Sequence, residues 1–135
     1  MASFSFDSSE LIVHEGALPP LLELLKSPLE KVQQQAAGAL WSLSINDDNQ
    51  VRIVSSNGLP SVIKLLQSTS EILQEQGAGI MRNLAIDSDN KVRIAHEGGV
   101  APLVSLLRSP QPKIQEEACG ALRNLSINGD NQLRL

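Results

Sequence analysis

The side chains that could carry out catalysis are few and far apart in this sequence. Cys119 is the one cysteine, and a thiol becomes a strong nucleophile only where a base or a positive charge lowers its pKa. No histidine shares the predicted helix face of Cys119, so we expect a structural thiol. His14 and His96 stand at one position of an internal repeat, with Ser55 between them, and we expect no metal pair. The sequence therefore predicts a chain that is not an enzyme and uses no metal or cofactor.

Three short patterns resemble known sites but lack the surroundings that those sites need. Asp87-Ser88-Asp89-Asn90 offers oxygen ligands without the glycine and terminal glutamate of a calcium loop, so helix capping is expected there. Gly77-Ala78-Gly79 falls inside a predicted helix, whereas a phosphate-binding loop follows a strand. Asn124-Leu125-Ser126 fits a glycosylation sequon but also lies in a predicted helix. None of the three predicts a site.

Composition excludes several classes of partner. The chain has 135 residues, which suits one folded unit, and its net charge is −4 with no cluster of Lys and Arg, so no nucleic acid partner is expected. No apolar stretch reaches the roughly 20 residues that span a bilayer, and residues 1–6 do not resemble a signal peptide. With a single cysteine, these features predict a protein of the cytoplasm or nucleus that contacts no membrane.

An internal repeat of 41 residues dominates the sequence. Leu24-Leu25-Lys26-Ser27 recurs as Leu65-Leu66-Gln67-Ser68 and as Leu106-Leu107-Arg108-Ser109, without insertion or deletion. A period of this length is typical of stacked helical repeats. We therefore predict an all-α solenoid. Residues 1–6 would be an extension and residues 7–135 a single domain, with repeats at about 7–47, 48–88 and 89–129 and the start of a fourth at 130–135.

Boundary residues predict three helices in each repeat. In the second repeat the first helix is expected at about 49–55, capped by Asp48, and the second at about 59–67, with Pro60 in its first turn. Between them, Asn57-Gly58 predicts a turn with positive φ, as do Gly16 and Gly98-Gly99 in the other repeats.

The third and longest helix is predicted to begin at a capping box. Ser68 with Glu71, like Ser27 with Glu30, has the spacing of that motif, and Pro28 and Pro110 would occupy the first helical position. Hydrophobic residues at helical spacing predict the core face of this helix. They are Val32, Ala36, Leu40 and Leu43, then Leu73, Gly77, Met81 and Leu84, then Ile114, Ala118, Leu122 and Leu125. Ala37, Ala78 and Cys119 form a flanking column expected to pack between repeats.

The repeat resembles the armadillo repeat of β-catenin, importin-α and the plant U-box ligases. Residues 16–22 (Gly-Ala-Leu-Pro-Pro-Leu-Leu) and 120–126 (Gly-Ala-Leu-Arg-Asn-Leu-Ser) carry the resemblance, which covers the chain from about Asp7 onward. It implies a right-handed superhelix whose third helices line a concave groove that binds an extended peptide. Gly38, Gly79 and Gly120 stand where importin-α carries its tryptophans, so a β-catenin-like or U-box-like groove is the nearer resemblance.

Equivalent residues of the third helices form three columns that would line this groove. The asparagine column is Ser42, Asn83 and Asn124, the arginine column is Trp41, Arg82 and Arg123, and the glutamine column is Gln35, Gln76 and Glu117. An asparagine amide has donors and an acceptor, so it could pair with a peptide N–H and C=O together. Alternatively, these asparagines bond the backbone of neighbouring helices.

The arginine column predicts an acidic or neutral peptide, because arginines repel a basic one. Alternatively, the arginines form surface ion pairs with Glu75, Glu116 or Glu117. Trp41 could anchor a ligand, or it could lie flat over the neighbouring repeat, against Arg82. The glycines within the third helices predict close approach of a neighbour, since glycine costs about 1 kcal/mol against alanine in a helix.

Apolar residues near both ends of the sequence predict a second kind of contact. Leu11 and Ile12 end the first predicted helix, and Leu133 and Leu135 match Val51 and Ile53 of the second repeat. Stacked repeats usually end in polar capping repeats, which this sequence lacks. The chain could therefore be a piece of a longer or designed array, or copies could associate end to end. The peptide-binding scaffold, the self-associating module and the substrate-binding region of a larger ubiquitin ligase remain three hypotheses.

Overall fold

The computed structural model describes residues 7–127, and every regular element in that range is an α-helix. The helices repeat in groups of three, with two short helices followed by a long one. They are α1 (Ser8–His14), α2 (Leu18–Leu24), α3 (Glu30–Leu43), α4 (Asp47–Ser55), α5 (Leu59–Leu66), α6 (Glu71–Leu84), α7 (Ser88–His96), α8 (Val100–Leu106) and α9 (Pro112–Ser126). The predicted all-helical repeat architecture is confirmed.

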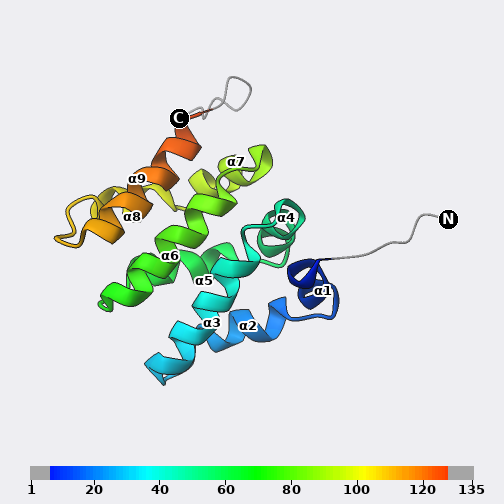
Figure 1. Cartoon of the computed structure of the whole chain (residues 1–135). Coiled ribbons are helices and arrows are strands. Elements are labelled where there is room, and N and C mark those ends of the chain that lie inside the picture. The colour runs from blue at the N-terminus through cyan, green and yellow to red at the C-terminus, as the bar shows by residue number, and fades with distance from the viewer. Residues whose placement is uncertain (1–6, 128–135) are drawn as a thin grey trace.

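The long helices form one layer of the stack. α3, α6 and α9 lie side by side, and α6 in the middle packs against both of the others (Figure 1). Each long helix also packs on the short helix before it, α3 on α2, α6 on α5 and α9 on α8. Because the period is constant, residues at one position of the repeat come to lie next to each other on adjacent helices.

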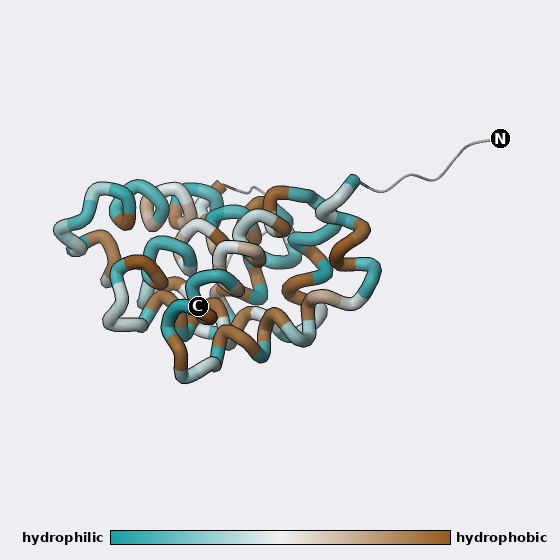
Figure 2. Tube along the Cα trace, turned by 60° about the horizontal axis from the view of Figure 1, so that its bottom comes forward, coloured by the Kyte–Doolittle hydropathy of each residue, from teal (hydrophilic) through white to brown (hydrophobic). Residues whose placement is uncertain are grey.

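The core is aliphatic, as the composition predicts. Leu40, Met81 and Leu84 of the predicted stripes are completely buried, and so is Ile53 of the first helix of the second repeat. Hydrophobic and hydrophilic segments alternate along the trace of the helices, which is expected where each helix buries one face (Figure 2). No helix among the described residues is long and apolar enough to cross a membrane.

The first helices of the repeats begin one to two residues earlier than the sequence indicates. Asn46, rather than Asp48, caps α4, and its side chain accepts a hydrogen bond from the Asn49 amide at 3.0 Å. Asp87 caps α7 in the same way through the Asn90 amide, also at 3.0 Å. Asp48 lies inside the first turn, where its charge still suits the helix dipole. The capping interpretation of residues 87–90 is confirmed.

The predicted capping box of the third helix is wrong. Ser70 caps α6 and accepts from the Leu73 amide at 3.3 Å, while the Ser68 hydroxyl accepts from the Ser70 amide at 3.0 Å. Ser27 and Ser109 likewise accept from the amide two residues on. Each serine therefore closes a small turn before the helix. In consequence α3 and α9 begin two residues after Pro28 and Pro110 rather than at them.

The turns between the first and second helices match the prediction. Gly16 and Gly98 have φ of 93° and 89°, and Asn57 at the equivalent position has a φ of 63°. Asparagine is the non-glycine residue that tolerates this region best, because its side chain can bond locally. The turns fix how each second helix approaches its long helix, and hence where the columns of the long helices fall.

Candidate functional site

The three predicted columns come together on the layer made by α3, α6 and α9. Ser42, Gln35 and Arg123 are exposed, while the remaining members of the columns are half-buried. The half-buried ones are Trp41, Gln76, Arg82, Asn83, Glu117 and Asn124. Half-burial of long polar side chains indicates contacts with the neighbouring repeat, and the structure identifies each contact.

Each asparagine of the asparagine column donates one hydrogen bond to the preceding repeat. Asn124 Nδ2 donates to the Arg82 carbonyl at 2.8 Å, which is the backbone contact that the sequence left as an alternative. Asn83 Nδ2 donates to the Ser44 hydroxyl at 2.9 Å, and Ser44 in turn donates to the Trp41 carbonyl at 2.6 Å. Within residues 7–127, neither Oδ1 accepts a hydrogen bond. Each amide therefore keeps an acceptor and a second N–H for another ligand.

Trp41 lies against the next repeat, and its contact is with Gly79. A Cβ built on Gly79 would stand 2.6 Å from the indole Nε1 and closer still to Cε2 and Cζ2. Trp41 is partly buried and packs on the hydrophobic core. The close approach that the sequence predicts for the mid-helix glycines is confirmed here, and the tryptophan is a stacking residue between repeats.

Arg82 repeats the arrangement of Trp41 one repeat later. Its side chain covers Gly120, where a built Cβ would stand 2.7 Å from the guanidinium Cζ, and its Nη1 lies 3.5 Å from Glu117 Oε1. The ion-pair alternative is therefore realised at Arg82. Arg123, the third member of the column, is exposed and pairs with no carboxylate of residues 7–127.

The glutamine column has a carboxylate, Glu117, in place of an amide at its last member. Gln76 Nε2 donates to the Gln34 carbonyl of the preceding repeat at 2.9 Å, and its buried Oε1 has no partner among the described residues. Glu117, at the equivalent position, cannot donate a hydrogen bond when it is ionised. Burial raises the pKa of Glu117, and the nearby carboxylates of Glu116 and Glu75 add to this, against the opposing charge of Arg82.

Replacing Glu117 by glutamine is expected to remove the loss of stability that comes from ionising a partly buried carboxylate. The raised pKa means that the folded protein keeps a proton that the unfolded chain releases above about pH 4.5. The free energy of unfolding therefore falls as pH rises from about 4.5 through the raised pKa. We expect Glu117→Gln to flatten this pH dependence. The new amide should donate to the Glu75 carbonyl, as Gln76 does to the equivalent Gln34 carbonyl, and raise the free energy of unfolding by about 0.5–1 kcal/mol at pH 7.

Urea unfolding of Glu117→Gln between pH 4 and pH 7 tests this expectation. Glu71→Gln is the matched control, because it removes the same charge from an exposed position of a long helix and Glu71 is not among the charges that shift the Glu117 pKa. Lower stability of Glu117→Gln than of the control at pH 7 would mean that the pair with Arg82 outweighs the burial of the carboxylate.

Two buried asparagines outside the columns join the repeats, which the sequence did not predict. Asn49 Nδ2 donates to the Leu43 carbonyl at 3.0 Å and to the Ser9 carbonyl of the preceding repeat at 3.2 Å. Asn90 Nδ2 repeats the pattern with Leu84 and Gln50. Their recurrence at the repeat period was a usable signal, but an asparagine near a helix start is more often a cap.

The predicted burial of Cys119 is wrong for the described residues. Ala37 and Ala78 are completely buried between long helices, whereas Cys119 is exposed because no described helix covers that side of α9. Leu11 and Ile12 are also exposed, and Leu133 and Leu135 lie outside the described residues. Among residues 7–127, no three His, Cys, Asp or Glu side chains are placed to share a metal ion.

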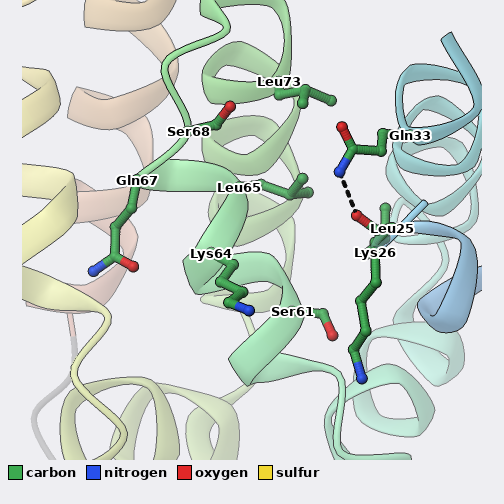
Figure 3. Close-up of a pocket in the computed structure, with 9 residues that line it drawn as sticks. All are labelled: Leu25, Lys26, Gln33, Ser61, Lys64, Leu65, Gln67, Ser68 and Leu73. Atoms are coloured by element: carbon green, nitrogen blue, oxygen red, sulfur yellow. Dashed lines mark hydrogen bonds between the residues drawn. The ribbon is translucent and has the colours of Figure 1, made fainter. Parts of the chain in front are cut away.

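A hollow of about 470 Å³ lies between the first two repeats, away from the asparagine column. It is bounded by the loop after α2 and by α5, and Gln33 Nε2 donates to the Leu25 carbonyl at 2.8 Å on its wall. Lys26 and Lys64 lie on either side of Ser61 at one end of the hollow, away from Leu73 and Ser68 (Figure 3). It adjoins the first turns of α3 and α6, whereas the asparagine column lies near their last turns, so it is not part of the candidate surface.

Comparison with known proteins agrees with the repeat and its geometry. The family model described as Armadillo/beta-catenin-like repeat matches residues 5–45 and 87–127, more than half of the chain. Protein ARABIDILLO 1 of Arabidopsis thaliana is 60% identical over 35 residues, and ARABIDILLO 2 of the same organism is 54% identical over 35 residues. Those segments are 26% of this chain and 4% of each relative.

Solved structures of engineered repeat proteins have the same fold. The crystal structure of one engineered protein matches with a TM-score of 0.84 and 34% identity, over 87% of this chain and 48% of that one. A designed armadillo repeat protein in complex with the peptide (KR)4 matches with a TM-score of 0.82 and 25% identity, over 86% of this chain and 49% of that one. This chain is thus a member of the armadillo/beta-catenin-like repeat family.

Proposed function

We propose that this chain is a non-catalytic scaffold that binds an extended polypeptide across α3, α6 and α9. The observation that carries the proposal is the asparagine column. Asn83 and Asn124 are each fixed by one hydrogen bond to the preceding repeat, and each has an Oδ1 without a partner in residues 7–127. A side chain held in place with unused donor and acceptor atoms is suited to bind a peptide backbone, since little conformational freedom is lost on binding.

The spacing of the column fits an extended chain. Two residues of a strand advance about 6.6 Å, and packed helices lie about 8–10 Å apart, or closer on the inner side of a curved stack. Successive asparagines could then meet every second residue of a peptide that crosses the long helices. Contacts of this kind bind the peptide backbone. The peptide side chains would then contact the arginine and glutamine columns, which would determine which peptide sequences bind best.

Charge on either side of the asparagine column favours an acidic or neutral peptide. Arg82 is engaged by Glu117, but Arg123 is exposed and unpaired within residues 7–127, next to Asn124 in the sequence. An acidic side chain of the ligand could reach Arg123 and form a two-pronged contact with the guanidinium. Glu75 and Glu116 lie two turns before Arg82 and Arg123 on the same helix faces, and Glu117 pairs with Arg82, so acidic groups of the peptide should lie near the exposed Arg123 rather than near the first turns of α6 and α9.

The designed armadillo protein crystallised with (KR)4 provides a comparison ligand of opposite charge. That basic peptide is the one that the arginine column should bind less well. Peptides of alternating Asp and Ser, of Ala and Ser, and of Lys and Arg, all of equal length, therefore separate backbone binding from charge preference.

We expect the double variant Asn83→Ala, Asn124→Ala to weaken every bound peptide about tenfold, because two backbone contacts are lost together. Arg123→Gln should weaken only the acidic peptide. Arg108→Gln is the matched control, because Arg108 is exposed outside the three columns and the charge change is the same. Binding can be followed by fluorescence anisotropy of labelled peptides, with circular dichroism to show that each variant keeps its helices.

Two results would contradict the proposal. Unchanged peptide affinity in the double asparagine variant would exclude the backbone clamp. Equal loss with Arg123→Gln and Arg108→Gln would show that the acidic peptide responds to overall charge rather than to the arginine column.

A further inference from the structure

The N-terminal end of the stack exposes hydrophobic residues whose equivalents inside the stack are buried. Ile12 is 46% exposed and Leu24 is 44% exposed, whereas Ile53 and Leu65, one repeat later, are 0% and 3% exposed. Beside Leu24 lies a hollow of about 370 Å³ lined also by Leu21, Val32 and Ala36. We call this surface, formed by Ile12, Leu21, Leu24 and Val32, the N-terminal face.

The other end of the described stack has the complementary property. Val104 is 43% exposed and Leu107 is 38% exposed, whereas their equivalents in the first repeat, Leu22 and Leu25, are 8% and 5% exposed. Cys119 is exposed where Ala37 and Ala78 are completely buried. We call the surface formed by Val104, Leu107 and Cys119 the C-terminal face.

Inside the stack, surfaces of these two types already pack on each other. Leu22 approaches Ile53 at Gly58, where a built Cβ would stand 3.4 Å from Leu22 Cδ2 and 3.0 Å from Ile53 Cγ2. Leu25 lies beside Leu65 along the joint between the same two repeats. Between repeats, the residues equivalent to the C-terminal face thus pack on the residues equivalent to the N-terminal face. The described residues 7–127 of one copy expose one face of each kind.

The arginine column also shows a contact that recurs between repeats and is missing at both ends of the described stack. Trp41 covers Gly79 and Arg82 covers Gly120, so the first two members of the arginine column each rest on a glycine of the next repeat. Arg123 has no such glycine in residues 7–127, and a Cβ on Gly38 would meet only Gln76 Nε2, at 3.5 Å. In a stack continued at the same period, Arg123 of one copy would lie on Gly38 of the next.

We propose that the C-terminal face of one chain packs on the N-terminal face of a second copy, continuing the repeat in register. This contact joins two different surfaces, so it does not close on a pair. Each added copy exposes another N-terminal or C-terminal face, and the product is an open row of copies rather than a twofold dimer. The inference does not depend on peptide binding. In such a row Arg123 would rest on Gly38 of the next copy, as Arg82 rests on Gly120, while the free Oδ1 atoms of the asparagine column would stay uncovered.

Sedimentation velocity over a range of chain concentrations tests the proposal. The average mass of the unmodified chain should rise continuously past that of a dimer. Leu24→Glu blocks the N-terminal face and Val104→Glu blocks the C-terminal face, so each variant alone should stay monomeric. An equimolar mixture of the two should form a dimer and grow no further, because it contains one unmodified pair of faces.

Controls separate this arrangement from its alternatives. Ile86→Glu changes an exposed isoleucine within the stack, 53% exposed, and should associate like the unmodified chain. Ile12→Glu and Leu107→Glu are a second pair of blocking variants, to be used if the first pair loses helix content. Reaction of Cys119 with a maleimide should slow as the concentration rises.

Three results would overturn the proposal. The first is a monomeric unmodified chain at every concentration. The second is a mass that levels off at a dimer and is lost in only one of the two blocking variants, which indicates twofold pairing of like faces. The third is a mixture of the two variants that stays monomeric.

Discussion

Asn90→Ala is expected to lower the free energy of unfolding by about 2–4 kcal/mol, because two hydrogen bonds to buried carbonyls are lost together. Asn90 is 3% exposed, and its Nδ2 donates to the carbonyls of Leu84 and Gln50, both at 3.1 Å. The Leu84 carbonyl ends α6, and the Gln50 carbonyl belongs to the first helix of the same repeat. The single amide therefore joins a helix end to the next repeat at a place that water cannot reach.

Asn90→Asp distinguishes lost hydrogen bonds from lost packing. Aspartate keeps the shape of asparagine but offers no N–H, so its stability loss should equal or exceed that of Asn90→Ala. Asn83→Ala is the matched control, since Asn83 is half-buried and gives one hydrogen bond to a hydroxyl, for which about 0.5–1.5 kcal/mol is expected. Urea unfolding followed by circular dichroism measures all three. If Asn90→Ala costs no more than Asn83→Ala, the joint between the repeats does not depend on this amide.

Much of the fold could be predicted because the period is unbroken. Constant spacing of Leu43, Leu84 and Leu125 fixes one register for the whole stack, and helical spacing gives the core face of each long helix. Helix starts were less predictable. The serine before each long helix has the spacing of a cap, but its hydroxyl bonds the amide two residues on and delays the helix. Sequence spacing alone cannot distinguish those two partners.

The sequence predicted on which side of its helix each candidate site residue lies, but it did not predict which residues of the next repeat each one contacts. A helical wheel places Asn83 and Arg82 away from the core of their own helix, which the structure bears out. It cannot say what the next helix brings beside them. Glu117 beside Arg82 and Gly79 under Trp41 are contacts between repeats, and they depend on how closely two helices approach. That approach is set by the small residues between them, which a single helix does not reveal.

The glycines of the long helices provide the sharpest test of those contacts. Gly79→Ala is expected to lower the free energy of unfolding by about 1–3 kcal/mol, because its Cβ would overlap the Trp41 indole. Gly38→Ala, at the equivalent position of the first repeat, should instead raise it by up to about 1 kcal/mol. Its Cβ meets only the Gln76 amide, at an ordinary contact distance of 3.5 Å, so the better helix propensity of alanine is gained without overlap.

A double variant shows whether the opposite signs come from the tryptophan. In a Trp41→Ala background the obstacle at Gly79 is gone, so adding Gly79→Ala should stabilise the chain, as Gly38→Ala does in the unmodified protein. Chemical unfolding of the four chains of this cycle gives the coupling energy directly, and Trp41 fluorescence reports whether the indole becomes more exposed in Gly79→Ala. A Gly79→Ala chain as stable as Gly38→Ala, with unchanged fluorescence, would mean that Trp41 does not rest on Gly79. The arginine column would then be free to serve a ligand at its first member as well as at Arg123.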